Sequence, residues 1–360
     1  MDDAGRTDIV KGGTFRFHAR MSIRWGIVGC GDVCEVKSGP GFQKARDSEL
    51  VAVMRRNGAL AEDFAKRHGV PKWYADADRL INDPEVDAVY VATTPGTHCE
   101  YAKRVAAAGK PCLMEKPMAR NTRECDEMIA AFEEAGQPLF VAYYRRAQDR
   151  FLKFKAAFAE LGPLRSVTYR LHQTPNFDAA NLPWRVLSAE SGGGFVMDMG
   201  CHALDMIDFL FGPLKEVVGR AENRSGIGDV EDTVEISWTH ESGVKGSAAF
   251  DFNAEQAIDQ IMVTGEAGSV TVPCFDLGPI TLNKNGHTSE IAYDQPEYVH
   301  QPFIQSVVDE LLGRGNCPGT AVDARRTNQV LDTVLSGYYG DRQTDFWQQP
   351  QSWPGRPAGD

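Results

Sequence analysis

The segment IRWGIVGCGDVCE, residues 23–35, decides the fold that the sequence predicts. A strand-like apolar run is followed at once by Gly29 and Gly31. Glycines at this spacing allow a tight turn, and they let backbone N–H groups at a helix start approach a pyrophosphate. The pattern is G-x-G-x-x-G/A with Cys34 in the last place, which is a departure. The segment favours a dinucleotide-binding turn over an ordinary glycine turn, with candidate contacts at Gly29, Gly31, Asp32 and Val33.

Short apolar segments alternate with helical patterns between residues 21 and 142. The predicted strands are 23–29, 49–55, 87–93, 111–117 and 138–144, and the predicted helices are 61–69, 98–110 and 121–136. Such alternation predicts βαβ units and a parallel sheet. The strands are apolar along most of their length, as burial on both faces requires. We therefore expect a Rossmann domain at residues 21–142.

The pattern changes after about residue 150. Strands now follow one another with short turns, at 166–174, 216–223, 232–240, 244–252, 259–265, 269–273 and 280–284, and two helices follow at 300–315 and 323–340. Successive strands predict a mainly antiparallel sheet. The fold class is therefore α/β, with a parallel Rossmann sheet and a second α/β domain at residues 143–345. Residues 1–20 are expected to be a disordered extension, and residues 346–360 a tail with little structure of its own.

The composition excludes several classes of partner. With 42% hydrophobic and 24% charged residues, the 360-residue chain resembles an ordinary soluble globular protein. No run approaches the ~18 apolar residues of a membrane span. A formal charge of −12 argues against nucleic acid and anionic membranes. The eight cysteines form no CxxC pair, which favours reduced thiols in the cytoplasm. Cys30 and Cys34 lack a second cysteine pair that would complete a metal site.

The end of the second predicted strand bears on the choice of dinucleotide. NAD-binding chains usually carry an acidic residue there for the adenine ribose. This chain has Met54, Arg55, Arg56 and Asn57 instead. A guanidinium can bind the 2′-phosphate that distinguishes NADP from NAD. We expect NADP, with NAD as the alternative, and the competing interpretation is two surface arginines.

The segment GGGFVMDMGCHALD, residues 192–205, places charged groups in an apolar helical pattern. Asp198, His202 and Asp205 are spaced to lie on one helix face. Such groups are costly inside an apolar helix unless they are paired or used. A structural network, a metal site and a proton-transfer site all fit the pattern, although the ligand set is only loosely selective for a divalent ion. The three glycines would let the chain or a ligand approach the helix start.

The order of these segments resembles the Gfo/Idh/MocA oxidoreductases. The resemblance runs from about Arg24 to Tyr339 and rests on GCGDVC, on TTPGTH at 93–98, on EKP at 115–117 and on GGGFVMDMGCHALD. It implies a Rossmann domain followed by an α/β domain with an open antiparallel sheet, which binds substrate and often mediates dimers or tetramers. It also implies NAD(P)-dependent oxidation of a secondary alcohol, or reduction of a ketone, on a sugar, sugar derivative or cyclitol.

The resemblance also assigns roles to particular residues. It makes Lys116 the catalytic lysine, in contact with nicotinamide and the reacting oxygen, and His202 the proton acceptor beside Asp198. It places Glu115, Thr94, Pro95 and His98 along the cofactor, although Gly96 stands where many members have asparagine. Trp184 and Arg185 match a pair near substrate, and Tyr143 and Arg146 are further candidates on the substrate side.

A proton-transfer site is the interpretation we favour for the segment 192–205. Hydride transfer requires that the hydroxyl proton also leaves, and a base with a pKa near neutral, His202, suits that step. An ammonium at Lys116 would stabilise the negative oxygen. Asp198 would fix the imidazole or hold a substrate hydroxyl, and Gly192–Gly194 would leave room for a sugar ring. We expect no metal, and Asp205 is interpreted as structural.

Two alternatives keep the fold but change the function. A cofactor-sensing regulator would bind the dinucleotide without catalysis, although it would need none of Lys116, Asp198 and His202. A glycosidase using transient NAD oxidation would cleave a glycosidic bond without net redox change.

Overall fold

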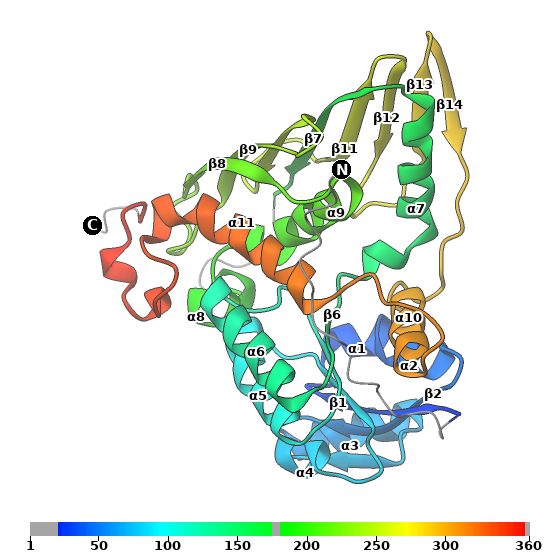
Figure 1. The fold of residues 1–360 in the computed structure, drawn as a ribbon. Coiled ribbons are helices and arrows are strands. Elements are labelled where there is room, and N and C mark those ends of the chain that lie inside the picture. Colours follow the sequence, from blue (N-terminus) through cyan, green and yellow to red (C-terminus); the bar gives the residue numbers. More distant parts are fainter. Residues whose placement is uncertain (1–20, 175–180, 357–360) are drawn as a thin grey trace, which may run out of the picture.

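The structure, a computed structural model, describes residues 21–174 and 181–356, so the predicted extension at residues 1–20 lies outside the described residues. Two sheets form its frame, one of six strands and one of eight (Figure 1). The long helix α11 (Ala321–Tyr339) crosses between them, packed on β8 (Lys215–Glu222) and on α6 (Thr122–Ala135). The predicted α/β class, a parallel sheet followed by a mainly antiparallel one, is confirmed.

The six-stranded sheet is parallel throughout, in the order β3-β2-β1-β4-β5-β6. Its order reverses between β1 and β4, so the loops after these two strands diverge and leave a crevice at the carboxyl edge. The strands are β1 (Ile23–Val28), β2 (Ser48–Met54), β3 (Lys72–Tyr74), β4 (Ala88–Val91), β5 (Cys112–Met114) and β6 (Leu139–Val141). β4, β5 and β6 are buried along their whole length, as the apolar segments predicted.

Helices connect these strands. They are α1 (Asp32–Val36), α2 (Gly39–Lys44), α3 (Gly58–His68), α4 (Ala77–Ile81), α5 (His98–Ala107) and α6. α3 begins where the Asn57 side chain accepts hydrogen bonds from the N–H groups of Ala59 and Leu60, and it ends at Gly69 in the left-handed conformation. The pair β3 and α4 was not predicted, because β3 is partly exposed and lacks the buried apolar run of the other strands, and the five residues of α4 are too few to show a helical period.

The eight-stranded sheet has the order β14-β13-β12-β11-β7-β10-β9-β8. Its pairs are antiparallel except β7 with β10, which are parallel. Besides β8, its strands are β7 (Leu164–His172), β9 (Thr233–Thr239), β10 (Lys245–Asp251), β11 (Ile258–Gly265), β12 (Gly268–Val272), β13 (Ile280–Lys284) and β14 (His287–Ile291). One face of the sheet packs against helices that include α7 (Asp149–Ala156), α9 (Cys201–Phe211) and α11. The last strand of the chain, β14, was not predicted from the sequence.

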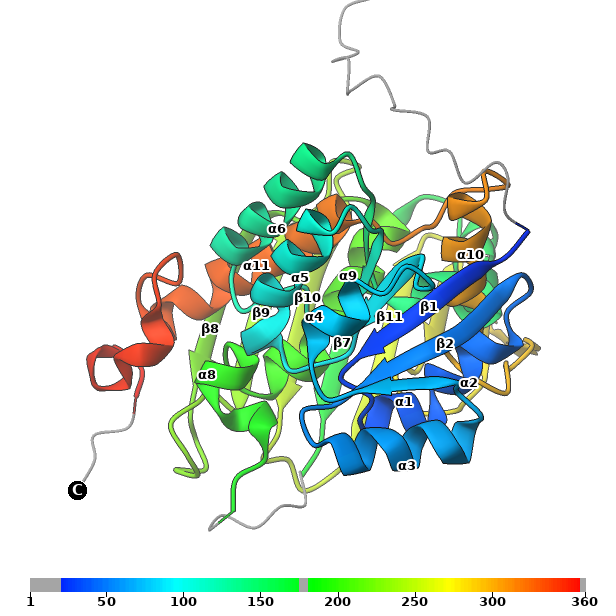
Figure 2. The ribbon, with the colours of Figure 1, turned by 90° about the horizontal axis from the view of Figure 1, so that it is seen from below.

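The second half of the chain returns to the first sheet through α10 (Gln301–Leu311). α10 packs beside α2 (Figure 1), and Figure 2 shows it near the start of β1. Phe303 and Ile304 of α10 are each 1% exposed and share a core with Trp25 and Phe42 of the first domain. The sequence assigned residues 143–345 to a single second domain, whereas this helix completes the core of the first.

The C-terminal segment differs from the expected tail. It forms short 3₁₀ turns at Phe346–Gln348 and Pro350–Ser352, and Trp353 is 4% exposed against Tyr339. The Trp353 indole N–H donates to the Phe346 carbonyl at 2.9 Å. The Pro- and Gly-rich composition predicted a tail with little structure, but the aromatic side chains of this segment are buried against α11.

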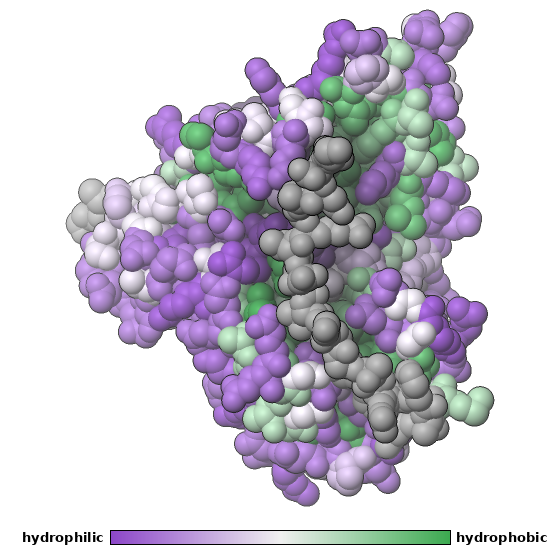
Figure 3. Space-filling model, viewed as in Figure 1, coloured by the Kyte–Doolittle hydropathy of each residue, from purple (hydrophilic) through white to green (hydrophobic). Residues whose placement is uncertain are grey.

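The surface is mainly hydrophilic on the face seen in Figure 3, and hydrophobic side chains gather on it near α7 and β12. Among the described residues, no helix combines the length and apolarity needed to cross a membrane.

Candidate active site

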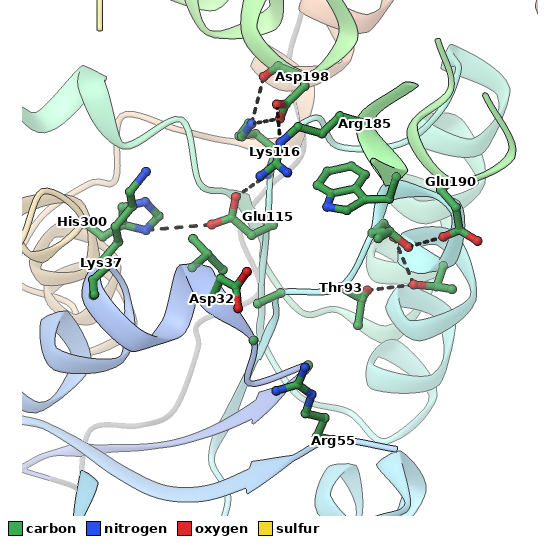
Figure 4. Close-up of a pocket in the computed structure, with 18 of the residues that line it drawn as sticks. Asp32, Lys37, Arg55, Thr93, Glu115, Lys116, Arg185, Glu190, Asp198 and His300 are labelled. Atoms are coloured by element: carbon green, nitrogen blue, oxygen red, sulfur yellow. Dashed lines mark hydrogen bonds and ion pairs between the residues drawn. The ribbon is translucent and has the colours of Figure 1, made fainter. Parts of the chain in front are cut away.

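A cleft of about 1040 Å³ lies between the carboxyl edge of the parallel sheet and the second domain. Its first wall consists of the segments that follow β1, β2, β4 and β5, near Gly29, Arg55, Thr93 and Glu115 (Figure 4). Its second wall carries Arg185, Asp198, His202, Phe275 and His300. The cleft thus opens at the point where the strand order reverses, which is where doubly wound sheets bind their ligands.

The turn after β1 has the geometry that a bound dinucleotide requires. Gly29 has φ +91°, and a Cβ there would lie 2.7 Å from the Thr93 Cγ2. A Cβ at Gly31 would meet only the Gly29 carbonyl oxygen, at 3.9 Å, so this position faces open space. Asp32 and Val33 of α1 also line the cleft. A backbone free of side chains and exposed to the cleft fits the approach of a pyrophosphate.

Two arginines border the cleft after β2. The Arg55 backbone N–H donates to the Tyr74 carbonyl at 3.2 Å, and its side chain is partly exposed, while Arg56 is exposed. Within residues 21–174 and 181–356, neither guanidinium forms a hydrogen bond or ion pair. Both residues line the cleft with Asn57. Two unpaired positive charges therefore lie at one end of the cavity.

The segment after β4 is held by hydrogen bonds to other parts of the cleft wall. Thr94 Oγ1 donates to Glu190 of α8 (Ser188–Ser191) at 2.6 Å (Figure 4). Gly96 permits this packing, because a Cβ there would lie 2.6 Å from the Ala189 carbonyl oxygen. The absence of the usual asparagine at Gly96 therefore has a steric reason.

His98 and Pro95 support this segment from behind. His98 is fully buried, with Nε2 3.0 Å from the Thr93 carbonyl oxygen and Nδ1 3.1 Å from that of Pro117. Burial lowers the pKa of His98 to about 4, so the ring is neutral. Pro95 is also buried, and neither residue lines the cleft. The expectation that they line the cofactor is therefore replaced by a positioning role, since His98 ties the turn after β4 to the turn after β5.

Lys116 follows β5 and points across the cleft. Its Nζ donates to the Asp198 carboxylate at 2.7 Å and to the Asp198 carbonyl at 2.8 Å (Figure 4). Burial disfavours the Lys116 ammonium, but the Asp198 charge outweighs it and raises the Lys116 pKa. The neighbouring Glu115 accepts hydrogen bonds from Tyr90 and from the Lys116 backbone N–H, and burial raises its pKa.

Asp198 lies on a π-helical turn, Val196–Gly200, that leads into α9. Its second carboxylate oxygen accepts a hydrogen bond from Arg185 Nε at 2.9 Å. Burial opposes ionisation of Asp198, but Lys116 and Arg185 together lower its pKa. Arg185 in turn lies over the Trp184 ring at 4.7 Å, and both line the cleft. One carboxylate thus joins cations from both domains.

His202 lines the same end of the cleft and is 6% exposed. Its Nδ1 is buried with no hydrogen-bond partner, so Asp198 does not fix the imidazole as the sequence suggested. Burial lowers the His202 pKa well below its usual value, and the nearby charges of Arg145 and Lys116 lower it further. His202 is therefore neutral and able to accept a proton, although its pKa lies below the near-neutral value that the sequence analysis expected.

Two residues expected on the substrate side lie elsewhere. Tyr143 is 2% exposed and Arg146 is 3% exposed, and neither lines the cleft. Arg146 instead forms a bidentate pair with Asp205, at 2.9 and 2.7 Å. Burial raises the pKa of Asp205 to about 6 despite this pair. The structural interpretation of Asp205 therefore agrees with its buried pairing, whereas the placement of Tyr143 and Arg146 at substrate does not.

The glycines at 192–194 have a different reason from the one expected. All three are buried, and none lines the cleft. A Cβ at Gly192 would lie 2.7 Å from the Arg120 Cα, and one at Gly194 would lie 2.2 Å from the Glu231 carbonyl oxygen. They make room for the protein's own backbone rather than for a sugar ring.

Sequence reasoning missed the residues that adjoin the predicted ones. Tyr144 and Arg145 line the cleft where Tyr143 and Arg146 were expected, because the chain forms a 3₁₀ turn at Tyr144–Ala147. His300, which stacks on Tyr144 with ring centroids 4.2 Å apart, comes from the segment before α10. The repeated YYRR letters signalled the region but not which pair faces the cleft.

A metal site finds no support in the described parts of the chain, where no group of three or more His, Cys, Asp or Glu side chains could hold an ion. All eight cysteines are free.

A reversal of strand order that opens onto charged side chains of a second domain is the architecture of dinucleotide-dependent oxidoreductases. Residues 23–143 match the model of the oxidoreductase family with an NAD-binding Rossmann fold, and residues 151–271 match the GFO/IDH/MocA C-terminal domain. The chain belongs to the Gfo/Idh/MocA family of NAD(P)-binding oxidoreductases.

Known members resemble the chain over most of its length. Oxidoreductase P35 of Formosa agariphila is 36% identical over 317 residues, which cover 86% of this chain and 97% of that protein. The trans-1,2-dihydrobenzene-1,2-diol dehydrogenase of Sus scrofa is 30% identical, with 71% of this chain and 76% of that protein covered. The crystal structure of aldose-aldose oxidoreductase from Caulobacter crescentus, complexed with glycerol, has a TM-score of 0.78 and 26% identity, covering 86% of this chain and 95% of that one.

Proposed function

We propose that this protein is an NADP(H)-preferring dehydrogenase or reductase, acting on a secondary alcohol or ketone of a sugar, sugar derivative or cyclitol. The observation that carries the proposal is the meeting of Lys116, Asp198 and His202 in the same cleft as the glycine turn at Gly29 and the arginine at Arg55. A structural network alone would not require these groups to face a cavity of about 1040 Å³. A sensor would need the glycine turn but not the buried Lys116–Asp198 pair.

The described residues suit the proton and charge movements of such a reaction. A bound nicotinamide would accept or donate the hydride. His202, neutral and at the cleft, takes the hydroxyl proton when the alcohol is oxidised and returns it when the ketone is reduced. The Lys116 ammonium stabilises the negative charge that develops on the reacting oxygen. Asp198 keeps that ammonium charged and holds it in place.

The preference for NADP is supported by Arg55 and Arg56. Both guanidiniums lie at the cleft after β2, and within the described residues neither has a carboxylate partner. No acidic residue follows β2 at the place where NAD-binding chains carry one for the ribose hydroxyls. A 2′-phosphate would supply the missing partner through charge-assisted hydrogen bonds.

The substrate class is supported by the family's members. The aldose-aldose oxidoreductase is named for a sugar, and the diol dehydrogenase for a carbinol on a six-membered ring. A cleft lining with Trp184 beside charged groups suits a ring that carries several hydroxyls.

Two further expectations belong to this proposal. No helix of the described residues covers the outer face of the eight-stranded sheet, which includes Thr168, Glu235 and Ser247, and we expect this face to join copies into a dimer or tetramer. Sedimentation of the purified protein measures that state. Free cysteines agree with a cytoplasmic enzyme, which fractionation of cells would test.

Titration with NADPH and NADH, followed by nicotinamide fluorescence, tests the cofactor. We expect tighter binding of NADPH, lost in Arg55→Ala or Arg56→Ala and kept in Arg165→Ala, whose side chain is 65% exposed on the other sheet. Equal binding of the two dinucleotides would contradict the proposed preference for NADP but leave the proposed dehydrogenase activity in place. Binding of neither would overturn the proposal.

Substitution of Lys116 tests catalysis. Lys116→Met should lower turnover of an oxidised sugar by about 10²- to 10³-fold, because one stabilising donor at the reacting oxygen is lost. The dissociation constant for NADPH should change far less. Lys110→Met is the matched control, because Lys110 precedes β5 as Lys116 follows it. Unchanged turnover in Lys116→Met would favour a non-catalytic sensor.

A further inference from the structure

Arg145 is a buried cation in the cleft wall without an anionic partner. It is 6% exposed, lines the cleft, and follows Tyr144 in the 3₁₀ turn. Its Nε donates to the Cys274 carbonyl at 3.0 Å, while its Nη1 is buried with no hydrogen-bond partner. The guanidinium carbon lies 4.5 Å from the Phe275 ring centroid and 4.9 Å from that of Tyr144. Within residues 21–174 and 181–356, no carboxylate pairs with it.

The next residue shows that this chain can neutralise a buried arginine. Arg146 is 3% exposed and has three acidic neighbours, Asp205 at 2.7 Å, Asp208 at 3.5 Å and Asp323 at 3.4 Å. Burial of an ion is costly unless a charge and hydrogen bonds compensate for the lost water. Contacts with two aromatic faces and one carbonyl compensate Arg145 only in part. A ligand that enters the cleft is the remaining source of negative charge.

Arg145 lies next to the groups that act on the substrate. The rings of Tyr144 and Phe275 that contact Arg145 also contact His202, with centroids 5.7 and 5.8 Å from the imidazole. Arg145 and His202 therefore contact the same two rings, so a group held by Arg145 lies in the part of the cleft that holds the proton acceptor. An anion bound there would belong to the reacting molecule and not to the far, arginine-bordered end of the cleft.

Among the described residues, more cationic than acidic side chains line the cleft as a whole. Asp198 is already bound to Lys116 and Arg185, so one negative charge faces two cations. Lys37, at the rim beside His300, has no ion-pair partner among the described residues (Figure 4). The other acidic residues of the cleft lining are Asp32, Glu115 and Glu190. Glu115 already accepts hydrogen bonds from Tyr90 and from the Lys116 backbone N–H, and Glu190 accepts one from Thr94.

We propose that Arg145 binds a carboxylate of the substrate, so that the reacting molecule is a sugar acid or related hydroxy acid whose carboxylate lies close to the reacting carbinol. The inference rests on the proposed function and narrows its substrate class. A phosphate ester offers similar chemistry, but its two negative charges exceed what Arg145 alone offers, and the Nε of Arg145 is already in use. A carboxylate carries one negative charge and so matches Arg145, which is buried and unpaired among the described residues, whereas Lys37 lies exposed at the rim.

Glycolate and ethylene glycol are a matched pair of probes, because both carry a carbinol and only glycolate carries a carboxylate beside it. With excess NADP⁺, we expect glycolate to raise the thermal unfolding temperature of the protein more than ethylene glycol does, because ligands that bind the native state stabilise it. Arg145→Gln should weaken glycolate binding by about 10-fold or more, the usual range for a hydrogen bond to a charged group. Arg145→Lys should retain part of the effect.

Arg150→Gln is the control for general damage to this region. Arg150 is also buried, has no carboxylate partner within the described residues, and also donates to the Cys274 carbonyl, but it does not line the cleft. Its substitution should leave the difference between the two probes in place. Equal stabilisation by both probes, or an equal glycolate effect in wild type and Arg145→Gln, would overturn the inference. A loss of NADP⁺ binding in Arg145→Gln as large as the loss of glycolate binding would also overturn it, since the anion would then be the cofactor's.

Turnover separates this inference from the proposed function. Hexoses, the corresponding hexuronates and hexose 6-phosphates should be compared as substrates by kcat/KM. A preference for hexuronates that falls about 10-fold or more in Arg145→Gln relative to Arg150→Gln supports a carboxylate. Preference for the phosphates assigns the site to a phosphate ester instead and contradicts the inference. Oxidation of neutral hexoses without any charge preference overturns the inference while the dehydrogenase stands, whereas failure to bind either dinucleotide overturns the proposed function itself.

Discussion

Where the parallel-sheet wall follows β2, its cations lie at the solvent, whereas the charges at the second-domain wall are partly or fully buried, and Lys116, which follows β5, reaches across the cleft to Asp198 of that second wall. Arg55 and Arg56 stand at the surface without ion pairs in the described chain, and the residues before them belong to a local strand and turn. Lys116 and Asp198 are 16% and 11% exposed as side chains and depend on each other across 82 residues. The first wall can change its ligand preference at little cost to the fold, because exposed charges contribute little to stability. The second wall cannot, because a buried ion left without its partner is costly.

Substitution of His202 should produce the largest effect. His202→Asn should lower kcat by about 10²- to 10⁴-fold, because the proton acceptor is lost. The dissociation constant for NADPH, set by the other wall, should stay close to the wild-type value. Steady-state kinetics with a sugar substrate and fluorescence titration measure the two quantities. If kcat and the dissociation constant for NADPH change by the same factor, the two walls do not have the separate roles that the comparison assigns to them.

The buried pair behind the second wall should dominate stability. Arg146→Met leaves Asp205 without its buried cation, while Asp208 keeps Arg326 at 2.6 Å, and should lower the free energy of unfolding by about 3–5 kcal/mol. Asp205 has a pKa of about 6, above the usual value for Asp, so its carboxyl binds a proton more readily in the folded state. The loss in Arg146→Met should therefore be larger at pH 8, where Asp205 is ionised, than at pH 5.

Urea unfolding of wild type, Arg146→Met and Arg145→Gln at the two pH values checks this difference. Arg145→Gln should lose much less, because no carboxylate in the described residues depends on Arg145. Equal losses at the two positions would show that the neighbouring arginines do not differ as the ion pairs imply.

On the first wall the effect should be confined to binding. Arg55→Ala and Arg56→Ala should each weaken NADPH binding by about 10-fold or more, the usual range for a hydrogen bond to a charged group, and leave NADH binding almost unchanged. The free energy of unfolding should not change measurably, since neither side chain is paired in the described structure. Fluorescence titration and urea unfolding provide both values. Marked destabilisation would mean that this wall, too, depends on its charges for folding.

The smallest effect concerns pH. Burial and the charges of Arg145 and Lys116 lower the pKa of His202, so the neutral ring persists below pH 6.5, and kcat/KM for alcohol oxidation should fall only at a lower pH. Removing one of those charges in Arg145→Gln should raise the His202 pKa and move the acid limb to higher pH. Arg150→Gln should leave the limb in place. If the acid limb of the pH profile does not shift in Arg145→Gln, the charge of Arg145 does not set the pKa of His202.

Local patterns made the first wall predictable. The glycine turn after β1, the arginines after β2 and the alternation of strands and helices each depend on residues close in sequence. The second wall depends on partners far apart in the chain. The letters YYRR could not indicate that Tyr144 and Arg145 face the cleft, because a 3₁₀ turn changes the phase expected after a strand.

The glycines at 192–194 show the same limit. Their spacing indicated a close approach. The approaching groups are far away in the sequence, however: Arg120 lies 72 residues before Gly192, and Glu231 lies 37 residues after Gly194. Likewise, the π-helical turn at Val196–Gly200 cannot be distinguished from an α-helix by apolar spacing over five residues.

The return of α10 to the parallel sheet bears on how members of this family can be recombined. A chimera joined at residue 142 would receive a foreign α10, and with it foreign side chains at the positions of Phe303 and Ile304, inside the core shared with Phe42. Exchange of substrate domains between relatives therefore needs two further junctions, on either side of Gln301–Leu311, so that this helix stays with its own sheet. The dinucleotide domain is therefore encoded by two separate stretches of the gene, and both must be transferred together if the domain is to keep its core.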